Sequence, residues 1–290
     1  MKERQIEDGI LTRIAEIFCA LFVVFSFAIV SFIFGSISGI KNLDSTGQRL
    51  VLGGIWILFA AGIAVAMYFA AGQKPLESFR ILEIRDKKQA WLLPAGSAFA
   101  FVGGIALNRV VILLVSLIPF PKDWVDKHDE IVTGTTQGNV FVAIIALCVI
   151  TPVIEELCFR GKAFYYLRKA FGQRLGTFFA VLLTSVLFAV SHVSYIQMIY
   201  AFVIGAVFAL LSLRSGSVVP SILAHAGFNI ANPIFLAWFS NESRENMALM
   251  LDIACIVVLI ICGAAVFVIG GILRGDSKDD GKSKQDIYIK

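Results

Sequence analysis

The sequence predicts an all-α polytopic membrane protein, a single bundle of about eight transmembrane helices. Hydrophobic residues make up 58% of the 290 residues and charged residues only 16%, against about 45–50% and about 25% in soluble domains. The charged residues lie between long apolar runs, and because these runs do not alternate with polar residues, transmembrane β-strands are excluded. Mean hydropathy is +0.83, which excludes a soluble globule, a disordered chain and a disulfide-stapled secreted domain.

Eight apolar runs are candidates for spanning helices, which need about 20 apolar residues. They cover residues 12–37, 49–71, 90–118, 139–160, 175–192, 196–213, 218–238 and 247–272. With the N-terminus in the cytoplasm, 19 of the 25 Lys and Arg residues fall on the cytoplasmic side and five on the other, while Arg109 lies inside the third run. This bias predicts cytoplasmic termini, and the short loops and compact single domain favour a prokaryotic cell membrane.

The chain divides into four parts along its length. Residues 1–138 hold three N-terminal spans, 139–238 form the core that bears the polar motifs, 239–273 add a C-terminal span, and 274–290 are a polar tail expected to be disordered and cytoplasmic. The acidic segment between the third and fourth spans is interpreted as a solvated outer loop. The five cysteines lie in apolar runs and are interpreted as reduced packing residues. The basic residues are topology signals, and no nucleic-acid partner is expected.

Two adjacent glutamates in the fourth run are the most informative residues. An ionisable side chain at mid-bilayer costs about 2.5–3.5 kcal/mol on insertion scales, so such residues usually face a bundle interior and have a function. Glu155 and Glu156 point about 100° apart on a helix and therefore have different roles. Glu156 and Arg160 are four residues apart with the acid first, the favourable order for an ion pair. Pro152 favours a kink one turn earlier.

Two of the three histidines complete the candidate set. Phe188 and His192 lie one turn apart at the end of the fifth run, and His225 and Asn229 lie one turn apart in the seventh. At 1.5 Å per residue, Glu155 lies about 25 Å and His192 about 30 Å along their helices from the predicted cytoplasmic turn between them. His225 lies only about 13 Å from the next cytoplasmic turn. Straight helices with level turns would therefore not bring His225 to the other two residues.

These residues carry a family resemblance. The boxes E-E-x-x-x-R, F-x-x-x-H and H-x-x-x-N correspond to Glu155/Glu156/Arg160, Phe188/His192 and His225/Asn229. The region from about 139 to 232 thus resembles the CAAX protease and bacteriocin-processing (CPBP, or Abi) family of intramembrane endopeptidases, which is related to the Ras-converting CAAX prenyl endopeptidase.

The resemblance implies hydrolysis of a peptide bond within the membrane, at a site open to the cytoplasmic side. Glu155 would activate water, His192 would help to hold that water, and His225 and Asn229 would donate hydrogen bonds to the oxyanion. Glu156, Arg160 and Phe188 would support the site. The partners would be the lipid bilayer and a membrane-associated or hydrophobic peptide, of CAAX or bacteriocin type.

Several alternatives remain open at this stage. Zinc is a possible cofactor, held by Glu155, His192 and His225, because two His and one carboxylate form a known ligand set. The usual His-Glu-x-x-His box is absent, and the family resemblance implies a metal-independent glutamate protease, which we favour. A transporter or a non-catalytic immunity or scaffold protein would also explain polar residues in spans. Arg109 is expected either to be the counter-ion of Glu155 or Glu156 or to snorkel to the outer surface.

Overall fold

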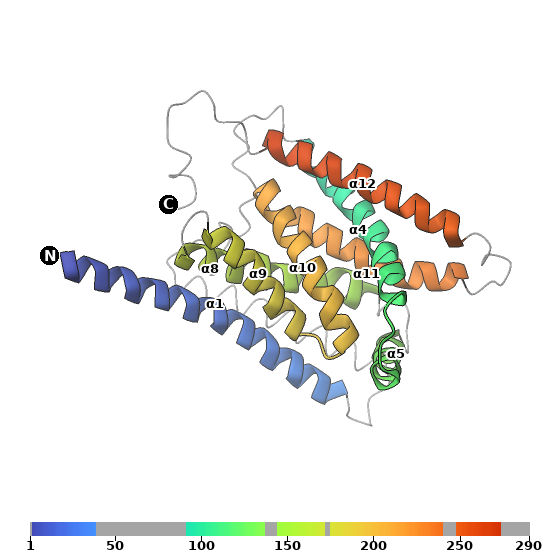
Figure 1. The fold of residues 1–290 in the computed structure, drawn as a ribbon, viewed down its shortest axis with the longest axis horizontal. Helices are drawn as coiled ribbons and strands as arrows, with labels where there is room; N and C mark the ends of the chain where they lie inside the picture. The colour runs from blue at the N-terminus through green and yellow to red at the C-terminus, as the bar shows by residue number, and fades with distance from the viewer. Residues whose placement is uncertain (1, 39–90, 137–143, 172–174, 240–247, 274–290) are drawn as a thin grey trace.

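The computed structural model describes residues 2–38, 91–136, 144–171, 175–239 and 248–273. The predicted span 49–71 and the predicted tail 274–290 lie outside these residues. The described helices are α1 (Lys2–Ser38), α4 (Leu92–Ser116), α5 (Lys122–Thr136), α7 (Thr151–Glu156), α8 (Phe164–Phe171), α9 (Leu175–Val190), α10 (Tyr195–Ser215), α11 (Val219–Phe239) and α12 (Ala248–Leu273), with π-helices η2 (Ala146–Ile150) and η3 (Leu157–Ala163) on either side of α7 (Figure 1).

The predicted all-helical class is confirmed, because the described ranges contain no strand. Within the described ranges, four helical stretches are long and apolar enough to cross a membrane: Gly9–Ile29 of α1, α4, α10 and the stretch Ala248–Ile272 of α12. The apolar stretch Gly176–Val190 of α9 is shorter. An integral membrane protein is thus supported, whereas the expected count of about eight spans is not confirmed.

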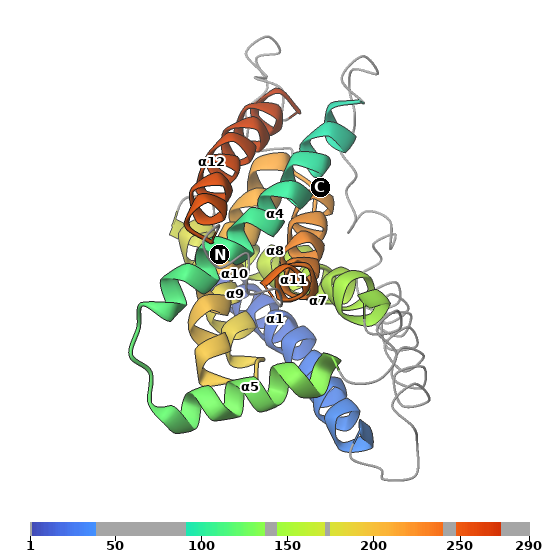
Figure 2. The same ribbon diagram turned by 90° about the vertical axis from the view of Figure 1, so that its right-hand side faces the viewer.

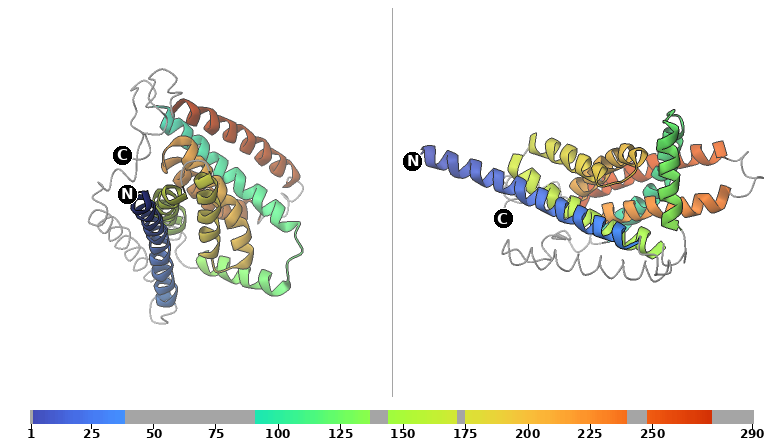
Figure 3. Two further views of the ribbon diagram at one scale, coloured as in Figure 1. Left: turned by 60° about the vertical axis from the view of Figure 1, so that its left-hand side comes forward. Right: turned by 90° about the horizontal axis from the view of Figure 1, so that it is seen from below.

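The helices form a bundle around α10 and α11. In Figures 1 and 3, α4 and α12 run side by side on one flank, and α1 lies on the opposite flank against η3 and α8. α9 and α10 pack against each other, and α11 packs along α4. The segment from η2 to α8 is therefore enclosed between α1, α9 and α11, and it carries both glutamates.

The surface and the interior have the polarity that a bilayer requires. Large apolar side chains are exposed along the outer helices, among them Phe18, Phe22, Phe25, Phe178, Ile260 and Phe267. Polar and charged side chains are buried inside, including Asn108, Glu155, Glu156, Arg160 and His225. Contiguous apolar surface of this extent is rare on soluble monomers, so we interpret the outer faces as lipid-facing.

The segment that was predicted as the fourth span, residues 139–160, contains an irregular helix around the two glutamates. Two π-helical stretches flank the single α-helical stretch Thr151–Glu156, and Pro152 lies in its first turn. Because π-helical turns hold more residues than α-helical turns, they shift the faces on which later side chains emerge. Short π-segments occur frequently at functional sites.

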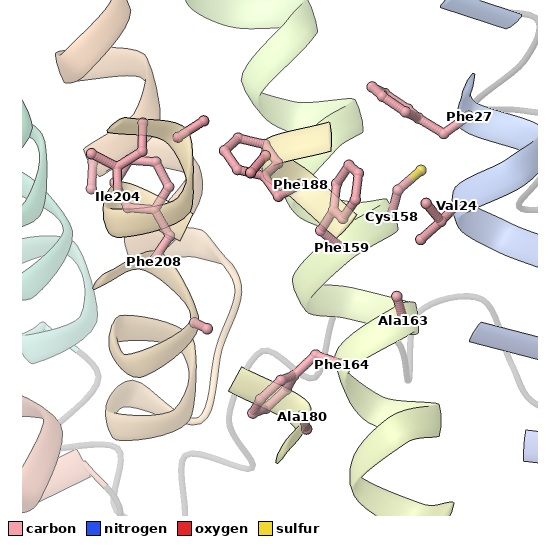
Figure 4. Packing of buried hydrophobic residues seen from close by; sticks show 14 of the residues in the cluster. Val24, Phe27, Cys158, Phe159, Ala163, Phe164, Ala180, Phe188, Ile204 and Phe208 are labelled. Carbon is pink, nitrogen blue, oxygen red and sulfur yellow. The ribbon is translucent and has the colours of Figure 1, made fainter. Parts of the chain in front are cut away.

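An aromatic cluster holds this segment between its neighbours. Phe159 of η3 meets Phe27 of α1 at a ring-centroid distance of 5.3 Å and Phe188 of α9 at 5.1 Å, both edge to face. In Figure 4, Val24 and Phe27 of α1 face Cys158 and Phe159 of η3. Edge-to-face aromatic pairs add about 0.5–1.5 kcal/mol each beyond the area they bury.

The segment between the third and fourth spans was predicted as a solvated loop; residues 122–136 instead form the helix α5, although their acidic side chains are exposed as predicted. This helix crosses the ends of α9 and α10 (Figure 2). Trp124 packs on Tyr195 at a centroid distance of 4.8 Å, and His128 Nδ1 lies 2.9 Å from Ser194 Oγ. The acidic residues mark only the exposed side of an amphipathic helix; Trp124 and His128 occupy its other side.

Candidate active site

Glu156 is a fully buried carboxylate with two cationic or potentially cationic neighbours. Its side chain has 0% exposure, and Arg160 Nη1 donates a 2.9 Å hydrogen bond to Glu156 Oε1. This ion pair is the predicted i, i+4 pair, and the structure confirms it. The second neighbour is His225, whose Nδ1 lies 3.0 Å from the same oxygen.

Arg160 is itself fixed from several sides. Its Nη2 donates to the carbonyl of Gly205 at 3.0 Å, and its guanidinium carbon lies 4.3 Å from the ring centroid of Phe188 and 5.6 Å from that of Phe208. A guanidinium over an aromatic face gains about 2 kcal/mol when desolvated. Arg160 is therefore a cationic partner of the buried Glu156 side chain, fixed by contacts from three helical segments.

His225 lies between the two glutamates. Its Nδ1 faces Glu156, and its Nε2 lies 3.7 Å from Glu155 Oε2. The ring stacks on Phe208 with centroids 5.1 Å apart and meets the edge of Phe188 at 5.8 Å. The expectation from straight helices and level turns, that His225 would lie at a different depth, is wrong.

Glu155 differs from Glu156 in its environment, as their 100° offset predicted. The Glu155 side chain is 12% exposed against 0% for Glu156. Its Oε2 approaches His225 Nε2 at a distance too long for a direct hydrogen bond. Glu156 is thus held by direct contacts with its partners, whereas Glu155 Oε2 lies 3.7 Å from His225 Nε2 without a direct hydrogen bond to it.

His192 lies just beyond α9, in the short connection to α10. Its Nδ1 is 2.8 Å from the carbonyl of Phe188, and its ring meets that of Phe188 at 4.9 Å. Since a carbonyl only accepts, Nδ1 carries the hydrogen in this arrangement. The structure therefore brings His192 and His225 onto the same aromatic ring, and leaves His192 Nε2 as the nitrogen available for other chemistry.

Asn229 extends the site along α11. Its Nδ2 donates to the carbonyl of Leu147 in η2 at 2.8 Å. This bond ties α11 to the π-helical segment before the glutamates, a contact that the sequence did not indicate. One of the two amide hydrogens of Asn229 is engaged there, and an amide nitrogen carries a second.

Sequence reasoning missed several residues that build the site. Phe208 and Gly205 of α10 contact His225 and Arg160, yet an apolar residue and a glycine in an apolar run give no local signal. Arg109 has neither of its expected environments, because its Nε donates to Asp252 Oδ1 of α12 at 2.5 Å, with both side chains largely buried. Asp252, an acid inside the last span, was the available signal.

A metal site was expected only as an alternative. Within the residues that the structure describes, no group of three or more His, Cys, Asp and Glu side chains is arranged to hold a metal ion. Glu155 and His225 lie close together, and His192 and His225 contact the same ring, that of Phe188. The zinc alternative stays a prediction.

Comparison with known proteins supplies the decisive observation. Residues 137–231 match the model of a family described as "Type II CAAX prenyl endopeptidase Rce1-like". The motif-bearing segment is thus similar to the CAAX protease family. This Rce1-like segment runs from just before η2 into α11 and includes every residue of the three boxes. It covers about a third of the chain, and the predicted resemblance is confirmed over that part.

The other two comparisons gave no match, neither to a curated protein nor to a solved structure.

Proposed function

We propose that this protein is an intramembrane endopeptidase in which Glu155 activates a water molecule for attack on a peptide bond. The Rce1-like match indicates a CAAX-type membrane protease. The observation that carries the finer proposal is the unequal pair of glutamates around His225. Glu156 is locked by Arg160, whereas Glu155 presents an oxygen 3.7 Å from His225 Nε2.

The proposed reaction transfers one proton from water to Glu155 and then from Glu155 to the leaving amine. Glu155 takes a proton from water as the water oxygen bonds to the carbonyl carbon, and the carbonyl oxygen becomes an oxyanion. Collapse of the tetrahedral intermediate breaks the carbon–nitrogen bond, and the proton passes from Glu155 to the leaving amine. A general base of this kind contributes about 10²–10⁴-fold to the rate.

The other residues have supporting roles in this proposal. His192 Nε2 helps to hold the water, and His225 Nε2 and the second amide hydrogen of Asn229 stabilise the oxyanion. His225 Nδ1 faces an acceptor-only carboxylate, so that nitrogen carries a hydrogen, and donation from Nε2 requires the imidazolium form.

The substrate in this proposal is a membrane-associated or hydrophobic peptide, such as a CAAX-type tail or a bacteriocin-like peptide. The site is buried between apolar helices whose outer faces are exposed, so a substrate that reaches it through the bilayer needs apolar character. If the alternative with zinc held, EDTA would abolish cleavage by the purified protein and metal analysis would find bound zinc. We expect cleavage to persist in EDTA.

The test compares peptides from membranes and medium by mass spectrometry for the wild type, Glu155→Gln and Glu130→Gln. Glu130 is a matched control, because it pairs with Lys127 on the exposed side of α5. We expect specific peptide termini to disappear in Glu155→Gln and to persist in Glu130→Gln. Identical peptides in all three strains would contradict the proposal, and proton-driven transport lost in Glu155→Gln would favour a transporter.

A further inference from the structure

α4 and α11 approach each other unusually closely around His225. A Cβ atom on Gly104 of α4 would overlap the backbone carbonyl of Ala224, and a Cβ atom on Gly227 of α11 would overlap that of Phe101. Ala224 and Gly227 flank His225 in the chain. The two backbones therefore touch on either side of the histidine, as small residues at membrane helix interfaces permit.

Asn108 adds a directional contact one turn further along α4. Its side chain is 1% exposed, and its Nδ2 donates to the carbonyl of Phe228 at 3.0 Å and to Asn232 Oδ1 at 2.9 Å. Phe228 immediately precedes Asn229. The backbone contact alone would let α11 slide or turn, whereas two hydrogen bonds from one amide define both its depth and its rotation.

The same turn of α11 needs such support. Pro233 lies inside the helix and has no N–H, so the carbonyl of Asn229 loses its intrahelical partner. The helix is weakened just beyond Asn229, the residue that must keep its amide in place. Asn108 bonds to the residues on both sides of this point, Phe228 and Asn232.

α4 is anchored independently of α11 at the adjacent residue. Arg109 pairs with Asp252 of α12 at 2.5 Å, with side-chain exposures of 15% and 10%. Figure 2 shows α4 between α11 and α12. The ion pair with Asp252 therefore holds α4 against α12, and the Asn108 amide holds α11 against α4. Because α4 has its own anchor, Asn108 can determine the position of α11.

From these contacts we infer that Asn108 is a positioning residue, which sets the depth and rotation of α11 so that His225 reaches Glu156 and faces Glu155. Asn108 lies outside the family-matched segment 137–231, so a helix from the N-terminal part of the chain completes the geometry of the core. The expected effect on cleavage rests on the proposed function, whereas the effect on His225 does not.

The variant Asn108→Ala removes both hydrogen bonds, and Ser97→Ala is its matched control. Ser97 is on the same helix and 3% exposed, and its hydroxyl has no hydrogen-bond partner among the described residues. On a peptide that the wild type cleaves, we expect Asn108→Ala to lower kcat at least tenfold with KM within about twofold. Ser97→Ala should leave kcat and KM unchanged. Asn108→Gln, which keeps an amide, should have a kcat between that of Asn108→Ala and that of the wild type.

A readout independent of activity is available because the chain has only three histidines. Nitrogen-15 NMR of histidine-labelled protein in nanodiscs reports the ring nitrogens of His225 separately from those of His128 and His192. Asn108→Ala should shift the His225 signals toward those of a free imidazole, while the other two rings stay near their wild-type values. Ser97→Ala should shift none.

The outcomes separate the two proposals. Shifted His225 signals in a protein that cleaves nothing would support the positioning role and refute the peptidase. Unshifted His225 signals in folded Asn108→Ala, or an equal shift in Ser97→Ala, would overturn the positioning role. If Asn108→Ala does not fold, Asn232→Ala removes only one of the two bonds, and the same comparison is made with that variant.

Discussion

Replacing Arg160 by methionine tests how the buried carboxylate is stabilised. The substitution keeps an unbranched apolar stem but removes the 2.9 Å bond to Glu156 and the 3.0 Å bond to the Gly205 carbonyl. Glu156 then keeps 0% side-chain exposure but loses its guanidinium partner, and His225 is the neighbour that remains on its Oε1. Leaving one member of a buried ion pair unpaired costs about 3–5 kcal/mol, so we expect the free energy of unfolding to fall by that amount.

The double variant Arg160→Met with Glu156→Gln separates charge from packing. Glutamine keeps an acceptor for His225 but removes the buried charge, so the double variant should return to within about 2 kcal/mol of the wild type. The matched control is Arg214→Met, because Arg214 also stacks on a phenylalanine, Phe267, at 4.0 Å and donates to its carbonyl. We expect the control to cost about 1 kcal/mol.

The assay is reversible unfolding in mixed micelles, followed by circular dichroism as the fraction of denaturing detergent rises. The reasoning would be refuted if Arg160→Met cost no more than Arg214→Met. It would also be refuted if the double variant were as unstable as the single one, because the loss would then come from packing and not from the unpaired carboxylate.

Two further predictions concern the neighbours of the site. A Cβ atom on Gly205 would lie 3.2 Å from Phe188 Cδ1 and 3.3 Å from Arg160 Nη2, so Gly205→Ala should cost about 1–3 kcal/mol in the same unfolding assay; a neutral effect would show that the contact relaxes. Burial lowers the pKa of His128 from its ordinary value of 6.5, and Asp129 opposes this only in part. Protonation of His128 therefore favours a state in which α5 has detached from α10. The packing of α5 against α10 should be equally stable at all pH values above 6.5 and should weaken as the pH falls below 6.5. Hydrogen exchange of α5, corrected for intrinsic rates, should rise at pH 5 in the wild type, and His128→Gln should abolish this pH dependence.

The sequence predicted the contacts that depend on helical spacing alone. Glu156 and Arg160 share a face whatever the surroundings, and the structure places them 2.9 Å apart. Phe188 and His192 also meet, at 4.9 Å, although His192 lies just beyond the end of α9 and the predicted span ran to residue 192. The different faces of Glu155 and Glu156 also follow from the turn of a helix, and their unequal burial agrees with that prediction.

Contacts between helices could not be predicted, because tilt and local helix geometry decide them. The rise per residue placed His225 at the wrong depth, since it assumed straight helices and level turns, whereas the fourth segment contains two π-helical stretches. Asn229 bonds to a backbone carbonyl of η2, and no side-chain pattern marks a carbonyl. The partner of Arg109 lies 143 residues away, beyond the reach of any local periodicity.

The most direct test of the central claim is the kcat of purified Glu155→Gln, measured in EDTA on a peptide that the wild type cleaves. The isosteric amide keeps the size of the side chain but is not a base at neutral pH. If Glu155 activates water, kcat falls at least about 100-fold, while the variant inserts and unfolds like the wild type. A kcat within threefold of the wild type would contradict the account, because the proton of the attacking water would then go elsewhere.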